Sequence, residues 1–110
     1  MAEIAFDEWK KLELKVGKIL QAERVPKTEK LYKLKVSLGE KAIQIVTSLV
    51  PYYSREELEG MKIVVLTNLK PTKFAGEVSE GMLLCAEKSD ESECVLLTVQ
   101  KDILEGTQIT

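Results

Sequence analysis

Apolar and polar residues alternate along most of this chain, which is the period-two pattern of half-buried β-strands. The alternation is clearest at residues 32–38, where lysine and serine separate four apolar side chains. Five further stretches have the length and the apolar or β-branched composition of strands: residues 12–19, 41–50, 61–67, 81–87 and 94–99. The sequence therefore predicts an all-β protein of about six short strands.

Two short helical turns are expected beside these strands. Near the N-terminus, Phe6 and Trp9 lie three residues apart and share a helix face. We expect this pair to fasten the turn to the rest of the domain or to a partner chain. The second turn follows the third strand, where Ser54 and Glu57 have capping-box spacing and Gly60 is placed to end a helix.

A five-stranded barrel with a helix between its third and fourth strands is the OB-fold arrangement. Gly17 interrupts the alternation of the first strand, as a β-bulge or a tight bend in a barrel would. A small sandwich is the alternative architecture. We expect the barrel, with residues 1–110 forming one domain that also carries the N-terminal turn and a short C-terminal strand extension.

Length and composition fit a small water-soluble domain. The chain has 110 residues, of which 45% are hydrophobic and 31% are charged. It has no apolar run near the roughly 20 residues of a membrane helix, and its N-terminus does not resemble a signal peptide. The two cysteines, Cys85 and Cys94, are expected to be small buried apolar residues without a disulfide. These features favour the reducing cytoplasm and no membrane partner.

The residue types argue against catalysis. There is no histidine, so the commonest general base and the commonest metal ligand are both missing. A structural zinc site needs three or four cysteine or histidine ligands, and the chain offers two. We therefore expect a protein that is not an enzyme and needs no cofactor or metal.

Charge is unevenly distributed along the chain. The net charge is −2, but residues 1–76 carry 14 basic and 10 acidic residues, whereas residues 77–110 carry 2 and 8. This asymmetry predicts a basic functional region and an acidic remainder, although an uneven distribution of surface charges without function gives the same pattern.

The connection NLKPTKFAGEVSEGM, residues 68–82, is long for a turn between two strands. Lys70 and Lys73 make it basic at one end, and Pro71 favours an extended backbone between them. Asn68 can hydrogen-bond to a phosphate, a 2′-hydroxyl or a base edge. An OB-fold binds oligonucleotides at this connection, so the sequence predicts a nucleic-acid-binding loop here.

Structural roles remain open for several of these side chains. Asn68 could bond backbone groups of its own turn, and Met82 could belong to the core rather than pack on a base. Glu80 could be an ordinary charge at a strand edge. Tyr52 and Tyr53 could stack on bases, but we expect them to pack against the short helix.

Six short motifs of the sequence resemble those of a known family. The motifs V-G-K, K-L-Y, Q-I-V, E-E-L-x-G, N-L-K-P and S-E-G-M occur in this order between residues 12 and 109. Together they are similar to the tRNA-binding OB domain of stand-alone tRNA-binding proteins, of methionyl-tRNA and phenylalanyl-tRNA synthetases, and of synthetase-complex cofactors. The resemblance implies non-catalytic, structure-selective tRNA binding by a homodimer joined through its terminal segments. It also implies a role as trans-acting cofactor or β subunit of an aminoacyl-tRNA synthetase.

The resemblance places the tRNA site on the long loop and on the K-L-Y motif. The residues it implies are Lys30, Leu31, Asn68, Lys70, Lys73, Ser79, Glu80 and Met82. The chain departs from the family pattern at two places: residues 47–48 read Thr-Ser where Ser-Gly is frequent, and residues 77–78 read Glu-Val where the order is often reversed. The first departure puts contacts near the third strand in doubt, and the second puts the orientation of the acidic side chain in doubt.

Two other classes of function compete with tRNA binding. A related branch of this fold is assigned as a peptide-binding export chaperone, which should bind extended apolar peptides with little dependence on salt. A purely structural dimerisation module is the third class, and in it mutations of the loop should affect no ligand. The N-L-K-P motif favours tRNA over both.

Overall fold

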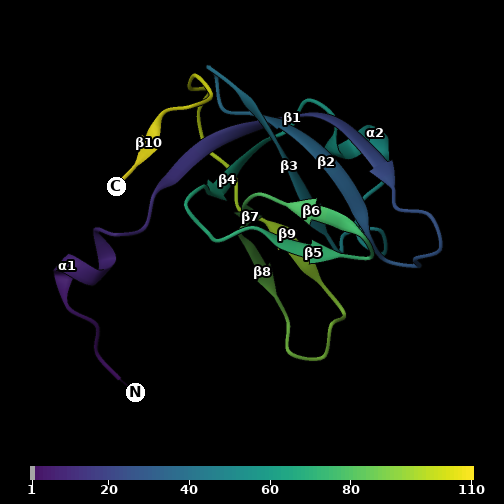
Figure 1. Ribbon diagram of the computed structural model, residues 1–110, viewed down its shortest axis with the longest axis horizontal. Helices are drawn as coiled ribbons and strands as arrows, with labels where there is room; N and C mark the ends of the chain where they lie inside the picture. Colours follow the sequence, from purple (N-terminus) through teal and green to yellow (C-terminus); the bar gives the residue numbers. More distant parts are fainter. Residues whose placement is uncertain (1) are drawn as a thin grey trace.

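The computed structural model describes residues 2–110, and strands dominate it (Figure 1). In chain order the elements are α1 (Phe6–Trp9), β1 (Leu14–Arg24), β2 (Tyr32–Ser37), β3 (Ala42–Thr47), α2 (Arg55–Leu58), β4 (Lys62–Leu66), β5 (Thr72–Phe74), β6 (Glu77–Ser79), β7 (Met82–Leu83), β8 (Cys85–Glu87), β9 (Cys94–Leu96) and β10 (Gln108–Ile109). The all-β class and the two short helices agree with the prediction.

The strands form a nearly closed barrel. The main sheet has the order β3-β2-β1-β4-β7, and all of its neighbouring strands are antiparallel. Its two ends meet where the Glu80 N–H donates to the Gln44 carbonyl oxygen at 2.8 Å and the Gln44 N–H donates to Glu80 Oε1 at 2.9 Å. With α2 between β3 and β4, this is the predicted OB-fold rather than a sandwich.

Strand β1 pairs with β4 over residues 14–18 and with β2 over residues 18–24, and Gly17 lies in the first of these segments. The pairing of β1 with β4 runs without interruption through Gly17, and the irregularity lies between Ile19 and Gln21. The β-bulge alternative is therefore wrong at Gly17. A Cβ atom there would lie 2.7 Å from Val36 Cγ1 and 2.9 Å from Val65 Cγ2. Glycine is needed because side chains from two other strands meet at this point inside the barrel.

The inward side chains of β2 and the cap of α2 follow the sequence pattern. Tyr32, Leu34 and Val36 all belong to the hydrophobic core and are nearly inaccessible to solvent. In α2, Ser54 Oγ accepts from the Glu57 N–H at 3.2 Å, while the Ser54 N–H donates to Glu57 Oε1 at 2.9 Å. This capping box starts the helix whose Leu58 fills one end of the core.

The β8–β9 hairpin places the two cysteines near each other. Cys85 lies opposite Leu96 and Cys94 lies opposite Glu87, so the thiols are diagonal neighbours on one face. Both are free, as predicted, although Cys85 is only half-buried. Burial, together with the neighbouring Cys94 thiol, raises the pKa of the Cys85 thiol to about 12. This thiol therefore stays protonated near neutral pH and is a weak nucleophile.

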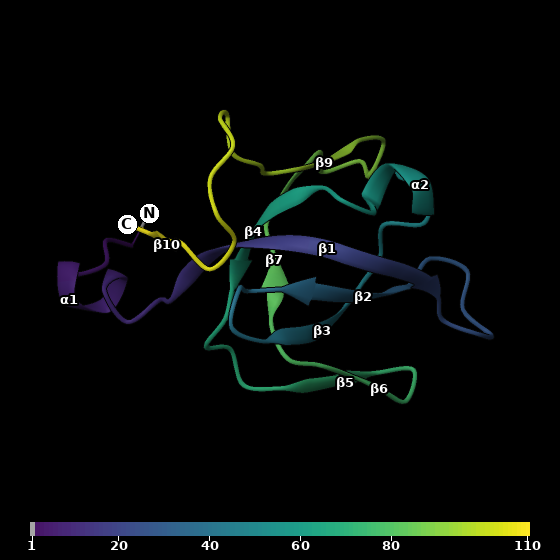
Figure 2. The same cartoon turned by 90° about the horizontal axis from the view of Figure 1, so that it is seen from above.

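Helix α1 and strand β10 lie on the same side of the barrel (Figure 1). Strand β10 is the predicted C-terminal extension, and it pairs with the start of β1 through Leu14 and Ile109. Helix α1 projects away from the barrel (Figure 2). Its Phe6 and Trp9 side chains are 72% and 40% exposed, so they are available to another chain. Within residues 2–110, no helix is long and apolar enough to cross a membrane.

Lys62 anchors the C-terminal segment to β4. Its ammonium nitrogen lies 2.7 Å from Asp102 Oδ1 and 3.6 Å from Glu105 Oε2, and it also donates to the Ile103 carbonyl oxygen. The hydrogen bond to Asp102 raises the pKa of Lys62, and the same bond lowers the pKa of Asp102. The Thr98 hydroxyl adds a hydrogen bond to the Lys62 carbonyl oxygen at 2.6 Å. Together these contacts fix the crossing that leads to β10.

Candidate nucleic-acid interface

The long connection between β4 and β7 folds as a β-hairpin, and we call residues 67–81 the arm. Strands β5 and β6 pair along it, and Ala75 and Gly76 form the two-residue turn with φ angles of +51° and +83°. Two successive positive φ angles are the signature of a type I′ hairpin turn. Figures 1 and 2 show that the tip of the arm points toward the end of the barrel that carries the β1–β2 loop.

Side chains from β2 and β3 fix the arm to the barrel. The Glu77 carboxylate lies 3.6 Å from the Lys33 ammonium nitrogen, and the Gln44 amide nitrogen donates to the Val78 carbonyl oxygen at 2.8 Å. Glu77, the acidic residue that is displaced from the family pattern, therefore faces the barrel. The arm is a supported element, so its backbone has a defined position against the barrel.

Lys70 and Lys73 are exposed on the arm, with Pro71 between them. Within residues 2–110, neither ammonium group forms an ion pair with a carboxylate. Two uncompensated positive charges on a supported hairpin can neutralise phosphates of a polyanion.

Ser79 and Glu80 lie at the seam that closes the barrel. Ser79 is 3% exposed, and its hydroxyl oxygen accepts from the Val46 N–H at 3.0 Å and donates to the Gly81 carbonyl oxygen at 2.9 Å. Glu80 is exposed, but its carboxylate accepts the Gln44 N–H. These two side chains hold the base of the arm, a role that their position in the sequence did not reveal.

Asn68 lies at the other end of the arm and bonds to a segment far away in the sequence. Its Oδ1 accepts from the Glu13 N–H at 3.0 Å, and its Nδ2 donates to the Lys11 carbonyl oxygen at 2.6 Å. The structural alternative raised for Asn68 was a bond within its own turn. The bonds instead connect the arm to the residues that precede β1.

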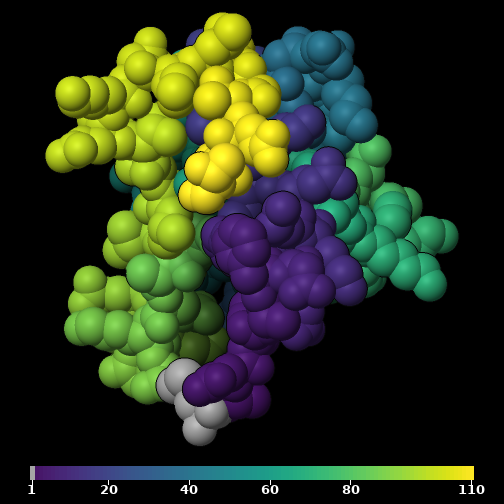
Figure 3. All heavy atoms as spheres, turned by 90° about the vertical axis from the view of Figure 1, so that its left-hand side faces the viewer, coloured from purple at the N-terminus to yellow at the C-terminus, as the bar shows by residue number. Residues whose placement is uncertain are grey.

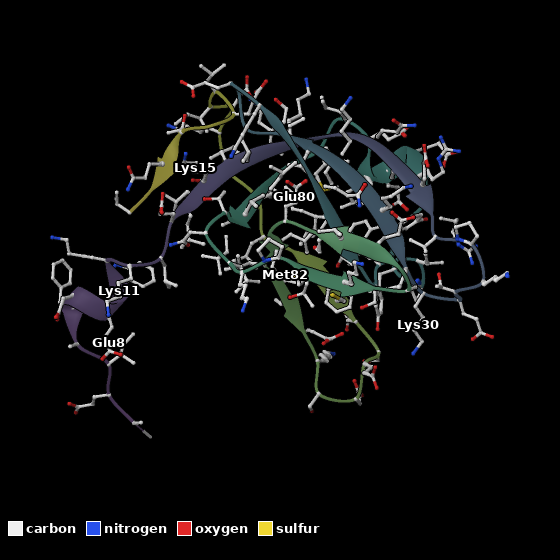
Figure 4. The ribbon with its side chains drawn as sticks, viewed as in Figure 1. Glu8, Lys11, Lys15, Lys30, Glu80 and Met82 are labelled. Carbon is white, nitrogen blue, oxygen red and sulfur yellow. The ribbon has the colours of Figure 1, made fainter. Side chains whose placement is uncertain are left out.

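The remaining predicted residues are spread along the molecule. Lys30 is exposed and Leu31 is half-buried in the loop between β1 and β2, while Met82 is half-buried at the start of β7. In Figure 4, Glu80 and Met82 lie near the middle of the molecule, and Lys30 lies at the end away from α1. The predicted residues therefore form an extended surface rather than one compact pocket.

A hollow of about 330 Å³ lies on the outer face of the sheet, beside the base of the arm. Its polar lining comes from Gln21, Glu23, Lys33, Lys35, Gln44 and Glu80. Lys33 is engaged by Glu23 at 3.9 Å as well as by Glu77. Sequence reasoning did not single out Gln21 and Gln44. Their position on outward-facing strand sites, next to inward apolar residues, was the signal that could have found them.

A second, more apolar hollow of about 340 Å³ lies between α1 and β10. Phe6, Trp9, Leu12 and Ile109 supply apolar side chains to it. Figure 3 shows the N-terminal segment in purple beside the C-terminal strand in yellow on this face. We call the surface formed by Phe6, Trp9, Leu12 and Ile109 the terminal surface.

Comparison with known proteins assigns the family. The family model described as "Putative tRNA binding domain" matches residues 14–108, from the start of β1 to the start of β10. The chain belongs to this tRNA-binding domain family. The resemblance seen in the sequence motifs is thereby confirmed, and the matched residues include the whole arm.

Homologous sequences occur within methionine–tRNA ligases. The chain is 46% identical over 109 residues to the methionine–tRNA ligase of Methanocaldococcus jannaschii, covering 99% of this chain and 17% of that enzyme. The corresponding enzyme of Clostridium perfringens is 45% identical over 107 residues, covering 97% of this chain and 16% of the enzyme. The chain thus spans about one sixth of the length of the curated relatives it matches.

Solved structures share the fold over the whole chain. A MetRS-related protein from Pyrococcus horikoshii superimposes with a TM-score of 0.93 at 38% identity, and the match covers 100% of both chains. The chaperone CsaA from Bacillus anthracis superimposes with a TM-score of 0.88 at 28% identity, covering 99% of this chain and 100% of that one. The same barrel therefore occurs in proteins named for two different activities.

Proposed function

We propose that this protein binds folded tRNA without catalysing a reaction, and that the arm is its principal contact. The observation that carries the proposal is a pair of exposed lysines, Lys70 and Lys73, on an arm that the barrel supports and with no ion pair to any residue of 2–110. Membership of the tRNA-binding domain family supports tRNA as the polyanion. Cytoplasmic location is part of the same proposal, since it is where a protein with two free cysteines meets tRNA.

The arrangement favours recognition of RNA shape. Contacts to phosphates set the position and orientation of a protein on a nucleic acid and carry no sequence information directly. Because the arm is fixed at its base, the two ammonium groups should fit only phosphates with a matching separation. A protein with a net charge of −2 and a local basic strip should select such a surface rather than coat any polyanion.

The proposed contact surface extends from the arm to the β1–β2 loop. Lys30 and Leu31 would extend the contact at the tip end of the arm, and Met82 would offer an apolar surface to the RNA. Asn68, Ser79 and Glu80 would support the surface, because their polar atoms bond to the protein itself.

The salt dependence of binding tests the proposal. With about four phosphate contacts, the logarithm of the affinity should fall with the logarithm of salt concentration at a slope of about −3 to −4. Fluorescence titration of bulk tRNA at several salt concentrations measures this slope. A slope near zero would remove the electrostatic mechanism.

We also propose that the protein is a homodimer and that residues 1–110 form one domain. One hydrophobic core draws on β1 to β4, α2, β7 and the β8–β9 hairpin. Most soluble homo-oligomers are two-fold dimers that use the same patch on both subunits. The terminal surface is suited to this, because Ile4, Phe6 and Trp9 are exposed next to an apolar hollow. Light scattering should give about twice the 12.4 kDa mass of one chain.

Two finer roles follow from the relatives. Homology with methionine–tRNA ligases supports action in trans, as a cofactor or β subunit that raises the local tRNA concentration of an aminoacyl-tRNA synthetase. Structural similarity to CsaA supports peptide binding as the second candidate. Binding of an extended apolar peptide that is insensitive to salt, together with no binding of tRNA, would favour the chaperone role.

A further inference from the structure

Four hydrogen bonds join the start of the arm to the segment that precedes β1. The two bonds made by the Asn68 amide reach Lys11 and Glu13. Beside them, the Thr67 N–H and the Thr67 hydroxyl both donate to the Glu13 carbonyl oxygen at 2.9 Å. More than fifty residues of sequence separate the two sides of this junction, which we call the Asn68 clamp.

The clamp lies at the point where the arm leaves the barrel. Strand β4 ends at Leu66, and Lys70 follows Asn68 by two residues. The other end of the arm is fixed independently by Ser79 and Glu80 at the barrel seam. The clamp therefore controls the path of residues 69–71, which join the barrel to β5 and carry the first of the two exposed lysines.

We propose that Asn68 is a positioning residue. By fixing the arm to residues 11–13 it orients Lys70 and Lys73 toward the RNA, and its own contact with RNA is not required. Both polar atoms of its amide already bond to the backbone of residues 11–13, so the amide has a structural role that does not depend on RNA. This inference rests on the proposed function, and it makes tRNA binding by the arm depend on the N-terminal segment. The segment that the clamp holds also carries α1 and the N-terminal part of the terminal surface.

A double-mutant cycle separates positioning from contact. We would measure tRNA affinity against salt for the wild type, Asn68→Ala, Lys70→Ala/Lys73→Ala and the triple variant. Loss of a neutral contact leaves the salt slope unchanged, whereas misplacing two lysines lowers it by up to about 2, at about 0.9 for each phosphate contact. We expect Asn68→Ala to lower the slope by about 1 to 2 and to have no further effect in the Lys70→Ala/Lys73→Ala background.

The control variant is Thr98→Ala, which removes a side-chain-to-backbone hydrogen bond at the opposite end of β4, to the Lys62 carbonyl oxygen. It should leave the salt slope at the wild-type value. An unchanged slope with weaker binding in Asn68→Ala, or an effect that adds fully to that of the double lysine variant, would overturn the positioning role. Failure of wild-type protein to bind tRNA, or normal binding by Lys70→Ala/Lys73→Ala, would instead overturn the proposed function.

Amide hydrogen exchange at Glu13 reports the state of the clamp from the N-terminal segment. The Glu13 N–H bonds to Asn68 Oδ1, so it should exchange faster in Asn68→Ala without tRNA. Because coupling between two sites is reciprocal, saturating tRNA should slow exchange at Glu13 in the wild type and not in Lys70→Ala/Lys73→Ala. Equal exchange at Glu13 with and without bound tRNA would show that the clamp does not couple the arm to the N-terminal segment.

Discussion

Replacing Lys70 and Lys73 with alanine removes the two charges on which the proposed interface depends. Both side chains are exposed, and within residues 2–110 neither pairs with a carboxylate, so the substitution should leave the fold intact. With about four phosphate contacts, raising salt from 50 to 200 mM should weaken wild-type binding ~100-fold. With two contacts removed, the same change in salt should weaken binding only ~10-fold.

The assay is a fluorescence titration of labelled bulk tRNA, with each variant measured at 50, 100 and 200 mM salt, a range in which such slopes are resolved. Circular dichroism checks that each variant is folded. The matched control is Lys88→Ala/Lys101→Ala, which changes the net charge equally but alters the acidic part of the chain. Lys88 lies on the β8–β9 hairpin, where it pairs with Glu93 at 2.8 Å, and Lys101 is exposed.

We expect the control pair to keep the wild-type salt slope. If both double variants lose the same slope, net charge alone governs binding and the arm has no special role. If neither loses slope, the RNA contacts another face of the barrel.

Three further predictions concern the terminal surface, the barrel seam and the C-terminal anchor. Phe6→Glu should shift the mass measured by light scattering from dimer to monomer while the circular dichroism spectrum of the folded barrel stays unchanged, and a mass that stays dimeric would place the subunit contact elsewhere. Ser79→Ala should lower the free energy of unfolding in urea by about 1 to 3 kcal/mol, because the buried Val46 N–H loses its acceptor. A cost near zero would mean that water replaces the hydroxyl. The pKa of Asp102 is lowered in the folded protein, so its contribution to stability is present above the unfolded pKa near 3.8 and is lost as pH falls through the folded pKa. The pKa of Lys62 is raised, so its contribution to stability is present below about 10.5 and is lost as pH rises through the folded pKa. Protection factors for amide exchange in residues 98–106, in which the intrinsic pH dependence of the exchange rate is divided out, should therefore be highest between these limits. Protection that does not fall below pH 4 would contradict this reading.

The sequence by itself determined the elements whose causes are local. Alternation at residues 32–38 predicted the inward face of β2, because neighbouring side chains of a strand point to opposite sides. The spacing of Ser54 and Glu57 predicted the start of α2, because both hydrogen bonds of the capping box form within four residues. The order of these elements and the family motifs were enough to indicate an OB-fold of the tRNA-binding domain family.

Only the tertiary structure decided what several residues of the long connection do. Ser79 bonds to Val46 across 33 residues of sequence, and Asn68 bonds to Lys11 and Glu13 across more than fifty. These partners become neighbours only when the barrel closes, so no local sequence pattern predicts them. Lys70 and Lys73 could be identified as candidate contacts from the sequence because an exposed charge needs no partner. A buried hydroxyl or an amide that bonds to backbone has a role defined by its partner, and folding supplies that partner.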